Sequence, residues 1–301
     1  MTAKLPLEIS EKKERLETLL AESGSAVVAF SGGGDSSLLA FLAFRNLGER
    51  MLAVTARSST HPEFQLADAR TLASRQGFPH LVIESEKLDI PDFRSNPPDR
   101  CYHCKRELFA KLREIADGRG LRWVFDGSNR DDASDYRPGM RAAAELGVRS
   151  PLAEAGLGKD EIRAISKSES LPTWDMPAYA CLASRFPYGV RIDPERLRRV
   201  EKAEAAVRAL GFRLFRVRYH GELARVEIAP QELPRALAAE MLAKISAGVK
   251  EAGFAYAALD LDGYRQGSMN ETLDIEDLPK EDRRESHRTA SGGARRERGR
   301  A

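Results

Sequence analysis

The sequence predicts an α/β protein with a doubly wound parallel sheet, followed by a smaller α+β domain. Two observations support this: short apolar runs alternate with amphipathic stretches in the first half, and this alternation stops near residue 191. Strand–helix–strand repetition produces a parallel sheet with helices on both faces, because each crossover packs back onto the sheet. We expect domains at residues 1–190 and 191–277, and a disordered basic tail at 278–301, which has almost no apolar residues.

Four apolar runs rich in Val, Ile, Leu and Phe are expected to be the buried parallel strands. They occupy residues 25–32, 50–57, 79–85 and 121–128. Helical spacing predicts helices at residues 1–20, 36–48, 62–77, 104–120 and 133–147. In the second domain the pattern predicts helices at residues 194–211 and 235–253, and strands at residues 212–220, 222–229 and 254–265.

The composition narrows the function. A net charge of +2 over 301 residues gives no strong attraction for nucleic acid, apart from arginines in the tail. No run approaches the ~18 apolar residues of a membrane span, and the N-terminus lacks the apolar core of a signal peptide. Three cysteines, an odd number, argue against a secreted disulfide scaffold. We therefore expect a cytoplasmic protein that uses its cysteines for metal binding or catalysis.

The stretch FSGGGDSS, residues 30–37, lies between the first strand and a helix. Successive glycines let backbone N–H groups converge on an anion, and the helix N-terminus adds its positive end. The stretch has neither the GK[ST] of a Walker A loop nor the GxGxxG spacing of a dinucleotide site. A glycine-rich turn capped by Asp or Ser is the structural alternative.

This SGGxDS loop resembles the PP-loop of the N-type ATP pyrophosphatases, which cleave ATP between its α- and β-phosphates. The resemblance assigns the nucleotide to matching loop residues, namely Ser31, Gly32, Gly33, Asp35, Ser36 and Ser37. It also implies that Asp35 holds Mg²⁺ against the pyrophosphate. It also places the end of the second strand, residues 55–57, near adenine and ribose.

A second stretch, residues 125–139, follows the fourth strand, so it lies at the same carboxyl edge of the sheet. It resembles the GTNxDD segment of the same superfamily. Its carboxylates would lie near the phosphates and be neutralised by magnesium: Asp126, Asp131, Asp132 and Asp135. An Asx-rich turn that caps the following helix is the alternative for each of them.

Four segments in order resemble the LarE family: residues 128–139, 184–189, 215–220 and 259–270. The resemblance runs from about residue 27 to 270. It implies an ATP-dependent sulfur transferase that adenylates a carboxylate of pyridinium-3,5-biscarboxylic acid mononucleotide. Sulfur then displaces AMP to leave a thiocarboxylate, and the second carboxylate follows, on the way to the nickel-pincer nucleotide of lactate racemase. Relatives form homo-oligomers, so we expect one here.

LarE-type proteins obtain sulfur in two ways: one sacrificial cysteine, or three cysteines that bind a [4Fe–4S] cluster. This chain has the three-cysteine pattern, Cys101, Cys104 and Cys181, with Ala180 at the sacrificial position. Three thiolates leave one iron open for sulfide from a separate source. There are three alternatives: a zinc site that includes His103, inert thiols, or a redox disulfide between Cys101 and Cys104. Against the zinc site, His103 lies inside the CxxC loop and would point away from the cysteines.

Arginines are expected to hold the anionic substrate. Arg216 and Arg218 alternate onto one face of a strand, and their forked donors suit phosphate or carboxylate. The resemblance gives them this role and gives Glu204 metal or substrate contacts. A solvated sheet face and a helix-surface Glu are the alternatives.

Ser184 and Arg185 adjoin the third cysteine and are expected to border the transfer site, and His220 is a weak candidate base. Two other functions stay open at this point. One is a PP-loop enzyme that thiolates tRNA, for which the charge supplies no obvious RNA-binding face. The other is a zinc-stabilised nucleotide-binding module without catalysis.

Overall fold

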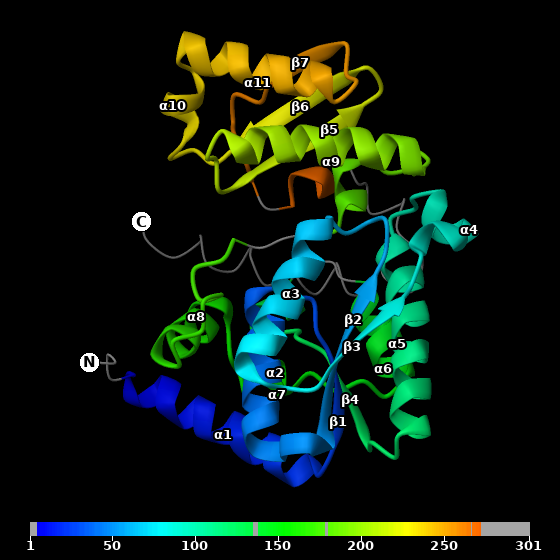
Figure 1. Cartoon of the computed structure of the whole chain (residues 1–301), viewed down its shortest axis with the longest axis vertical. Coiled ribbons are helices and arrows are strands. Elements are labelled where there is room, and N and C mark those ends of the chain that lie inside the picture. The colour runs from blue at the N-terminus through cyan, green and yellow to red at the C-terminus, as the bar shows by residue number, and fades with distance from the viewer. Residues whose placement is uncertain (1–4, 135–137, 178–179, 266, 272–301) are drawn as a thin grey trace, which may run out of the picture.

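The computed structural model describes residues 5–134, 138–177, 180–265 and 267–271, and these contain two sheets (Figure 1). The larger sheet has four parallel strands in the order β3-β2-β1-β4, which confirms the predicted parallel α/β fold. Its strands are β1 (Ala26–Ala29), β2 (Met51–Arg57), β3 (His80–Glu84) and β4 (Trp123–Phe125). Each lies inside one of the four predicted apolar runs.

Helices cover both faces of this sheet, because successive side chains of a buried strand point to opposite sides. Val27 and Val28 of β1 are both fully buried, and each belongs to a different apolar cluster. The cluster around Val28 includes side chains of α1 (Leu7–Ser23), α2 (Gly34–Leu47), α3 (Glu63–Gln76), α7 (Pro151–Glu154) and α8 (Lys159–Ser168). The cluster around Val27 includes α5 (Arg100–Gly118) and α6 (Gly139–Glu145).

The smaller sheet has the order β5-β6-β7. Strands β5 (Phe215–His220) and β6 (Leu223–Ile228) are antiparallel, and β7 (Tyr256–Leu259) pairs with β6 in parallel. Helices α9 (Pro194–Ala209), α10 (Leu233–Ala236) and α11 (Ala239–Glu251) accompany this sheet. The single helix predicted at 235–253 is wrong in one detail, because Ala238 has an extended backbone that separates α10 from α11. The residues between the two helices, Leu237 and Ala238, are neither glycine nor proline, so the sequence does not mark the break.

The apolar cluster of the smaller sheet extends back into the first half of the chain. It includes Leu88, Phe93 of the short helix α4 (Pro91–Arg94), and Leu182 of the 3₁₀ helix η4 (Leu182–Arg185). The smaller sheet therefore packs against the segment that follows Cys181. The division at residue 191 stays a prediction, and the predicted tail at 278–301 lies outside the described residues. Every helix in the described ranges is too short or too polar to cross a membrane.

Candidate functional site

A pocket of about 530 Å³ lies at the carboxyl ends of the parallel strands, the edge that faces the smaller domain in Figure 1. Its wall includes Ser31, Gly33, Asp35 and Ser36 of the glycine-rich loop. The same wall includes all three cysteines, Cys101, Cys104 and Cys181. The structure thus brings together at one cavity the two motifs that the sequence analysis singled out.

The glycine-rich loop has a backbone that only glycine tolerates. Gly32 has φ of 78°, and a Cβ there would lie 3.0 Å from the Cβ of Ala69. Within the loop, the Ser36 hydroxyl accepts from the backbone N–H of Ser31 at 3.2 Å and donates to the Gly33 carbonyl at 3.2 Å. No side chain caps the start of α2, which lines the pocket, so its first N–H groups are not bound by a capping side chain. This arrangement suits an anion.

The loop after β4 packs directly on the glycine-rich loop. A Cβ on Gly127 would lie 3.2 Å from the backbone nitrogen of Ser36, so only glycine permits this approach. Asn129 donates from Nδ2 to Asp35 Oδ2 at 3.0 Å and ties the two loops together. The prediction that both segments share one edge of the sheet is therefore confirmed by their contact.

The predicted carboxylates of the second segment have different surroundings. Asp126 and Asp132 line the pocket, but Asp131 does not. Asp126 accepts hydrogen bonds from the Ser128 hydroxyl at 2.8 Å and from Ser150 at 2.6 Å, so it also shapes its own turn. Asp131 accepts from the backbone N–H of Lys159 at the start of α8 at 2.8 Å, so it caps a helix, but not the one directly following that the capping alternative named. Asp135 lies outside the described residues.

Asp35 and Asp132 form a pair of carboxylates at the phosphate end of the pocket. Burial raises the pKa of Asp35, and the charge of Asp132 raises it further. Two hard oxygen donors with mutual repulsion fit a divalent cation such as Mg²⁺, which takes one or two protein carboxylates and completes its shell with phosphates and water. These residues therefore fit the predicted magnesium.

Two basic residues of α8, which the sequence analysis missed, line the same end of the pocket. The positive charges of Lys159 and Arg163 both act on Asp35 and lower its pKa against the effect of burial. Lys159 Nζ also lies 3.8 Å from Asp132 Oδ1. The two residues are four apart, which places both on one face of the helix. This spacing could have been recognised in the sequence as a basic helix face.

The CxxC pair lies in a helix, which corrects the expectation of a loop. Cys101 and Cys104 occupy the first turn of α5, which begins four residues before the predicted start. Residues three apart share a helix face, and this face is directed at the pocket. His103 lies on another side, with its ring nitrogens 3.7 Å from Asp92 and 3.5 Å from Asp99, and is not part of the pocket wall.

The three thiols are close enough to influence one another. Burial raises the pKa of Cys104 to about 12, and charge on Cys181 or Cys101 would raise it further. Burial also raises the pKa of Cys181, and Cys101 acts on it in the same direction. Burial thus favours the protonated thiol of Cys104 and of Cys181 even though Lys87 and Arg100 lie nearby, so a bound metal is the natural source of further positive charge.

The three thiols share one pocket wall, and His103 is not part of that wall. Among the described residues, no three His, Cys, Asp or Glu side chains are close enough to hold one metal ion. Cysteine thiolates are the ligands that hold [4Fe–4S] clusters in proteins. The donor set, three thiols without His103, therefore fits the predicted cluster.

A buried asparagine joins the two cysteine segments. Asn96, at φ 58°, donates from Nδ2 to the Pro187 carbonyl at 2.7 Å, and its own carbonyl accepts from Gly189 at 2.9 Å. Its Oδ1 accepts from Arg100 at 2.9 Å, and the Arg100 guanidinium lies 4.8 Å from the centre of the Tyr188 ring. These contacts fix the segment after Cys181 against the start of α5.

Arg185 fixes the backbone around the third cysteine. It donates to the carbonyls of Ala180 at 3.0 Å and Cys181 at 3.2 Å. Its Nε and Nη2 also bind the two oxygens of Glu204 at 2.7 and 3.0 Å, and both side chains are almost fully buried. Glu204 is therefore not a helix-surface residue, and it holds Arg185 rather than lining the pocket.

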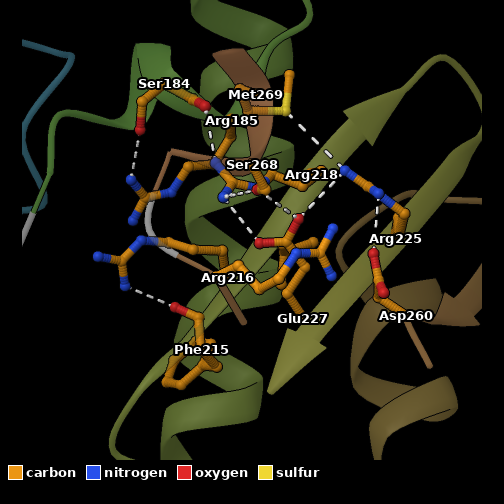
Figure 2. A network of polar contacts seen from close by, with 12 residues as sticks. Ser184, Arg185, Phe215, Arg216, Arg218, Arg225, Glu227, Asp260, Ser268 and Met269 are labelled. Carbon is orange, nitrogen blue, oxygen red and sulfur yellow. Dashed lines mark hydrogen bonds and ion pairs between the residues drawn. The ribbon is translucent and has the colours of Figure 1, made fainter. Parts of the chain in front are cut away.

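The two predicted substrate arginines are buried beneath this segment (Figure 2). Arg218 donates to the Ser184 carbonyl at 2.9 Å and to Glu227 at 2.7 Å, and Arg216 donates to the Phe215 carbonyl at 2.7 Å. Burial, together with the charge of Arg185, lowers the pKa of Arg216 to about 10. The solvated-face alternative is wrong, and contact with substrate stays a prediction, because neither arginine is part of the pocket wall.

His61 makes the stability of the fold sensitive to pH. Burial, with the charges of Lys87 and Lys105, lowers the pKa of His61 from 6.5 to about 4. Between these values the unfolded chain binds a proton that the folded chain does not, so stability falls as the pH falls. His80 and His220 are shifted in the same direction.

We expect the free energy of unfolding, measured by urea titration, to decrease as the pH falls from 6.5 towards about 4. A His61→Gln variant should show a shallower decrease over the same range, because one of the contributing imidazoles is gone. Equal slopes for the two proteins would show that His61 does not titrate in this way.

The first part of the chain, residues 8–112, matches the family model described as NAD synthase. The chain is 41% identical over 265 residues to an uncharacterised protein from Synechocystis sp., covering 88% of this chain and 99% of that protein. It is 35% identical over 269 residues to the pyridinium-3,5-bisthiocarboxylic acid mononucleotide synthase of Lactiplantibacillus plantarum, covering 88% of this chain and 96% of the synthase.

A weaker similarity extends to GMP synthases. The chain is 25% identical over 219 residues to one component of the glutamine-hydrolysing GMP synthase of Archaeoglobus fulgidus, covering 66% of this chain and 67% of that relative. Because the similarity to the mononucleotide synthase spans nearly all of both chains, this protein belongs to the LarE family.

Proposed function

We propose that this protein is an ATP-dependent sulfur transferase that converts the carboxylates of pyridinium-3,5-biscarboxylic acid mononucleotide into thiocarboxylates. The single observation that carries the proposal is the shared pocket, whose wall holds both the PP-loop and all three cysteines. The relative from Lactiplantibacillus plantarum, named for the bisthiocarboxylic product, supports the choice of acceptor.

ATP would bind with its phosphates on the glycine-rich loop and the start of α2. Lys159 and Arg163 supply positive charge there, and Asp35 and Asp132 would hold Mg²⁺ between their carboxylates and the phosphates. The end of β2, where Thr55, Ala56 and Arg57 also line the pocket, would bind adenine and ribose. A carboxylate oxygen of the acceptor attacks the α-phosphorus, the bond to the β-phosphate breaks, and pyrophosphate leaves.

The acyl-adenylate then receives sulfur. Sulfide attacks the acyl carbon, the bond to the AMP oxygen breaks, and a thiocarboxylate and AMP remain. A [4Fe–4S] cluster held by Cys101, Cys104 and Cys181 would supply an iron without a protein ligand, at which sulfide from a separate source can bind. Arg185 and the backbone of Ser184 keep the segment around Cys181 in place for this step.

The charge of the pocket suits such ligands. In the described part of the chain its wall includes six Lys or Arg side chains and four Asp or Glu side chains. ATP and a phosphorylated dicarboxylate are both anions, so an excess of positive charge favours their joint binding. Contact of the substrate with Arg216, Arg218 and Glu204 is a further part of this proposal. The binding of ATP and acceptor in the pocket does not depend on it.

The test is release of pyrophosphate by protein that has been reconstituted with iron and sulfide without oxygen. We expect release to depend on the pyridinium dicarboxylate mononucleotide, and mass spectrometry to show replacement of oxygen by sulfur in the product. Stimulation by tRNA instead would favour the tRNA-thiolating alternative. A colourless protein that contains zinc and releases no pyrophosphate with either acceptor would favour the non-catalytic module.

A further inference from the structure

One buried ammonium group in the pocket has no role in the chemistry described so far. Lys87 belongs to the 3₁₀ helix η2 (Lys87–Asp89), just after β3, and its side chain is 1% exposed. Lys87 nevertheless lines the pocket. Removing an ammonium ion from water costs several kcal/mol, so a lysine in this position requires compensation from anions.

The protein supplies only part of that compensation. Lys87 Nζ lies 2.5 Å from Glu107 Oε2 and also donates to the Ser85 hydroxyl. Ser85 itself donates to Glu107 Oε2 at 2.6 Å, so the three groups form a closed cluster. An ammonium has three N–H donors. Within the described residues no third acceptor bonds to Lys87 Nζ.

Glu107 does not neutralise Lys87 fully, because a second ammonium shares it. Lys111 Nζ lies 2.6 Å from Glu107 Oε1 on the outer side of α5. Burial alone would raise the pKa of Glu107, but the hydrogen bonds from Lys111 and Lys87 lower it to about 2. One carboxylate therefore faces two positive charges, and the cluster keeps a surplus of positive charge on its pocket side.

The position of Lys87 indicates which ligand its free donor meets. Its charge acts on Cys104 and on His61, whereas the charges that act on Asp35 at the phosphate end come from Lys159 and Arg163. Lys87 therefore lies towards the thiol end. Two other cations line this end of the pocket. Arg100 is bound to Asn96 and stacked on Tyr188. Lys105 Nζ lies 3.9 Å from Asp126 Oδ2 and 4.8 Å from the centre of the Phe109 ring.

We propose that Lys87 binds the acceptor carboxylate, donating its third N–H to a carboxylate oxygen and holding that group between the nucleotide and the thiols. This inference rests on the proposed function. Ser85 and Glu107 are positioning residues, since they orient the ammonium and do not themselves line the pocket. The site recognises the negative charge of the acid, so a neutral amide in its place should bind weakly.

The decisive variant is Lys87→Met, which keeps an unbranched side chain and removes the charge and its donors. We expect the KM for the pyridinium dicarboxylate mononucleotide in pyrophosphate release to rise about 10- to 100-fold, the range for a lost hydrogen bond to a charged group. The Kd of a non-hydrolysable ATP analogue, measured by calorimetry, should change less than about threefold. Lys111→Met is the matched control, because it removes the other ammonium from the same carboxylate but leaves the pocket intact.

A second variant keeps the test decisive if Lys87→Met does not fold. Ser85→Ala retains both the lysine and Glu107 and removes only the hydroxyl that orients Nζ, so the acceptor KM should rise about 3- to 10-fold with nucleotide binding unchanged. In wild type, replacing one acceptor carboxylate by its amide should weaken binding, and Lys87→Met should lose this discrimination.

The outcomes separate the inference from the proposed function. An equal loss of ATP-analogue and acceptor binding in Lys87→Met would show that Lys87 serves the phosphates and would overturn the inference. So would an unchanged acceptor KM in a folded Lys87→Met or Ser85→Ala protein. If wild type releases no pyrophosphate with this acceptor, the proposed function itself fails.

Discussion

Replacing Cys104 by serine is expected to abolish thiocarboxylate formation while ATP-dependent release of pyrophosphate continues within about threefold of wild type. The PP-loop and the carboxylates of Asp35 and Asp132, not the thiols, supply the groups proposed for activation of the acid, so this step does not need the cysteines. Sulfur delivery does, because a cluster loses its attachment when one of its three thiolates is removed. The measurement compares pyrophosphate with sulfur-containing product, and iron with acid-labile sulfide, in the reconstituted proteins.

The same loss should follow from Cys101→Ser and from Cys181→Ser, and the three substitutions should not be additive, because the thiols act as one unit. Ser184→Ala, beside Cys181 on the pocket wall, is the matched control and should retain iron. If only Cys181→Ser stopped sulfur transfer, and Cys181 lost its own sulfur during turnover, the protein would instead use a sacrificial cysteine.

Replacing Glu204 by glutamine is expected to destabilise the fold by about 3–5 kcal/mol, because it leaves the Arg185 guanidinium buried without its counter-ion. Both side chains of this pair are at most 4% exposed, and Glu204 also accepts from the backbone N–H of Val217 at 3.1 Å. Urea unfolding of wild type and variant gives the difference directly.

Glu240→Gln provides the comparison, since Glu240 pairs with Lys244 on the surface of α11 and its side chain is 80% exposed. That substitution should change the unfolding free energy by less than about 1 kcal/mol. A double variant, Arg185→Met with Glu204→Leu, should recover part of the lost stability, because no charge then remains buried and unpaired. Equal effects of Glu204→Gln and Glu240→Gln would show that the buried pair is not needed.

The sequence was sufficient to predict the parallel sheet and the PP-loop, because both depend on local patterns of residues. Apolar runs such as residues 50–57 have the length and the Val, Ile and Leu content of a buried strand, and the glycines of residues 32–34 occur directly after one. The carboxyl ends of parallel strands share an edge, so the meeting of the PP-loop with Asp126 followed from topology. The convergence of Cys181 with the CxxC pair was expected only from the resemblance to LarE.

The remaining site residues could not be found locally. Lys87 lies in the polar stretch SEKLD, which is indistinguishable from a solvated turn, and its burial arises from α5 packing against the end of β3. Glu204 lies in a helix rich in Glu and Arg, where nothing along the chain distinguishes the buried carboxylate from its exposed neighbours. Its partner Arg185 is nineteen residues away, and only the tertiary fold brings the two together.

The cavity at the strand ends also affects how the two equivalent acid groups of the proposed acceptor ring would be converted in turn. Only one of these groups can meet the PP-loop at a time, since the wall of the pocket includes one such loop and one set of thiols. Under the proposed function, a half-converted molecule would therefore have to rotate in place, or dissociate and return the other way round, before its remaining acid is converted. The enzyme would then treat each half as a separate round of catalysis, with a mixed oxygen–sulfur species between the two.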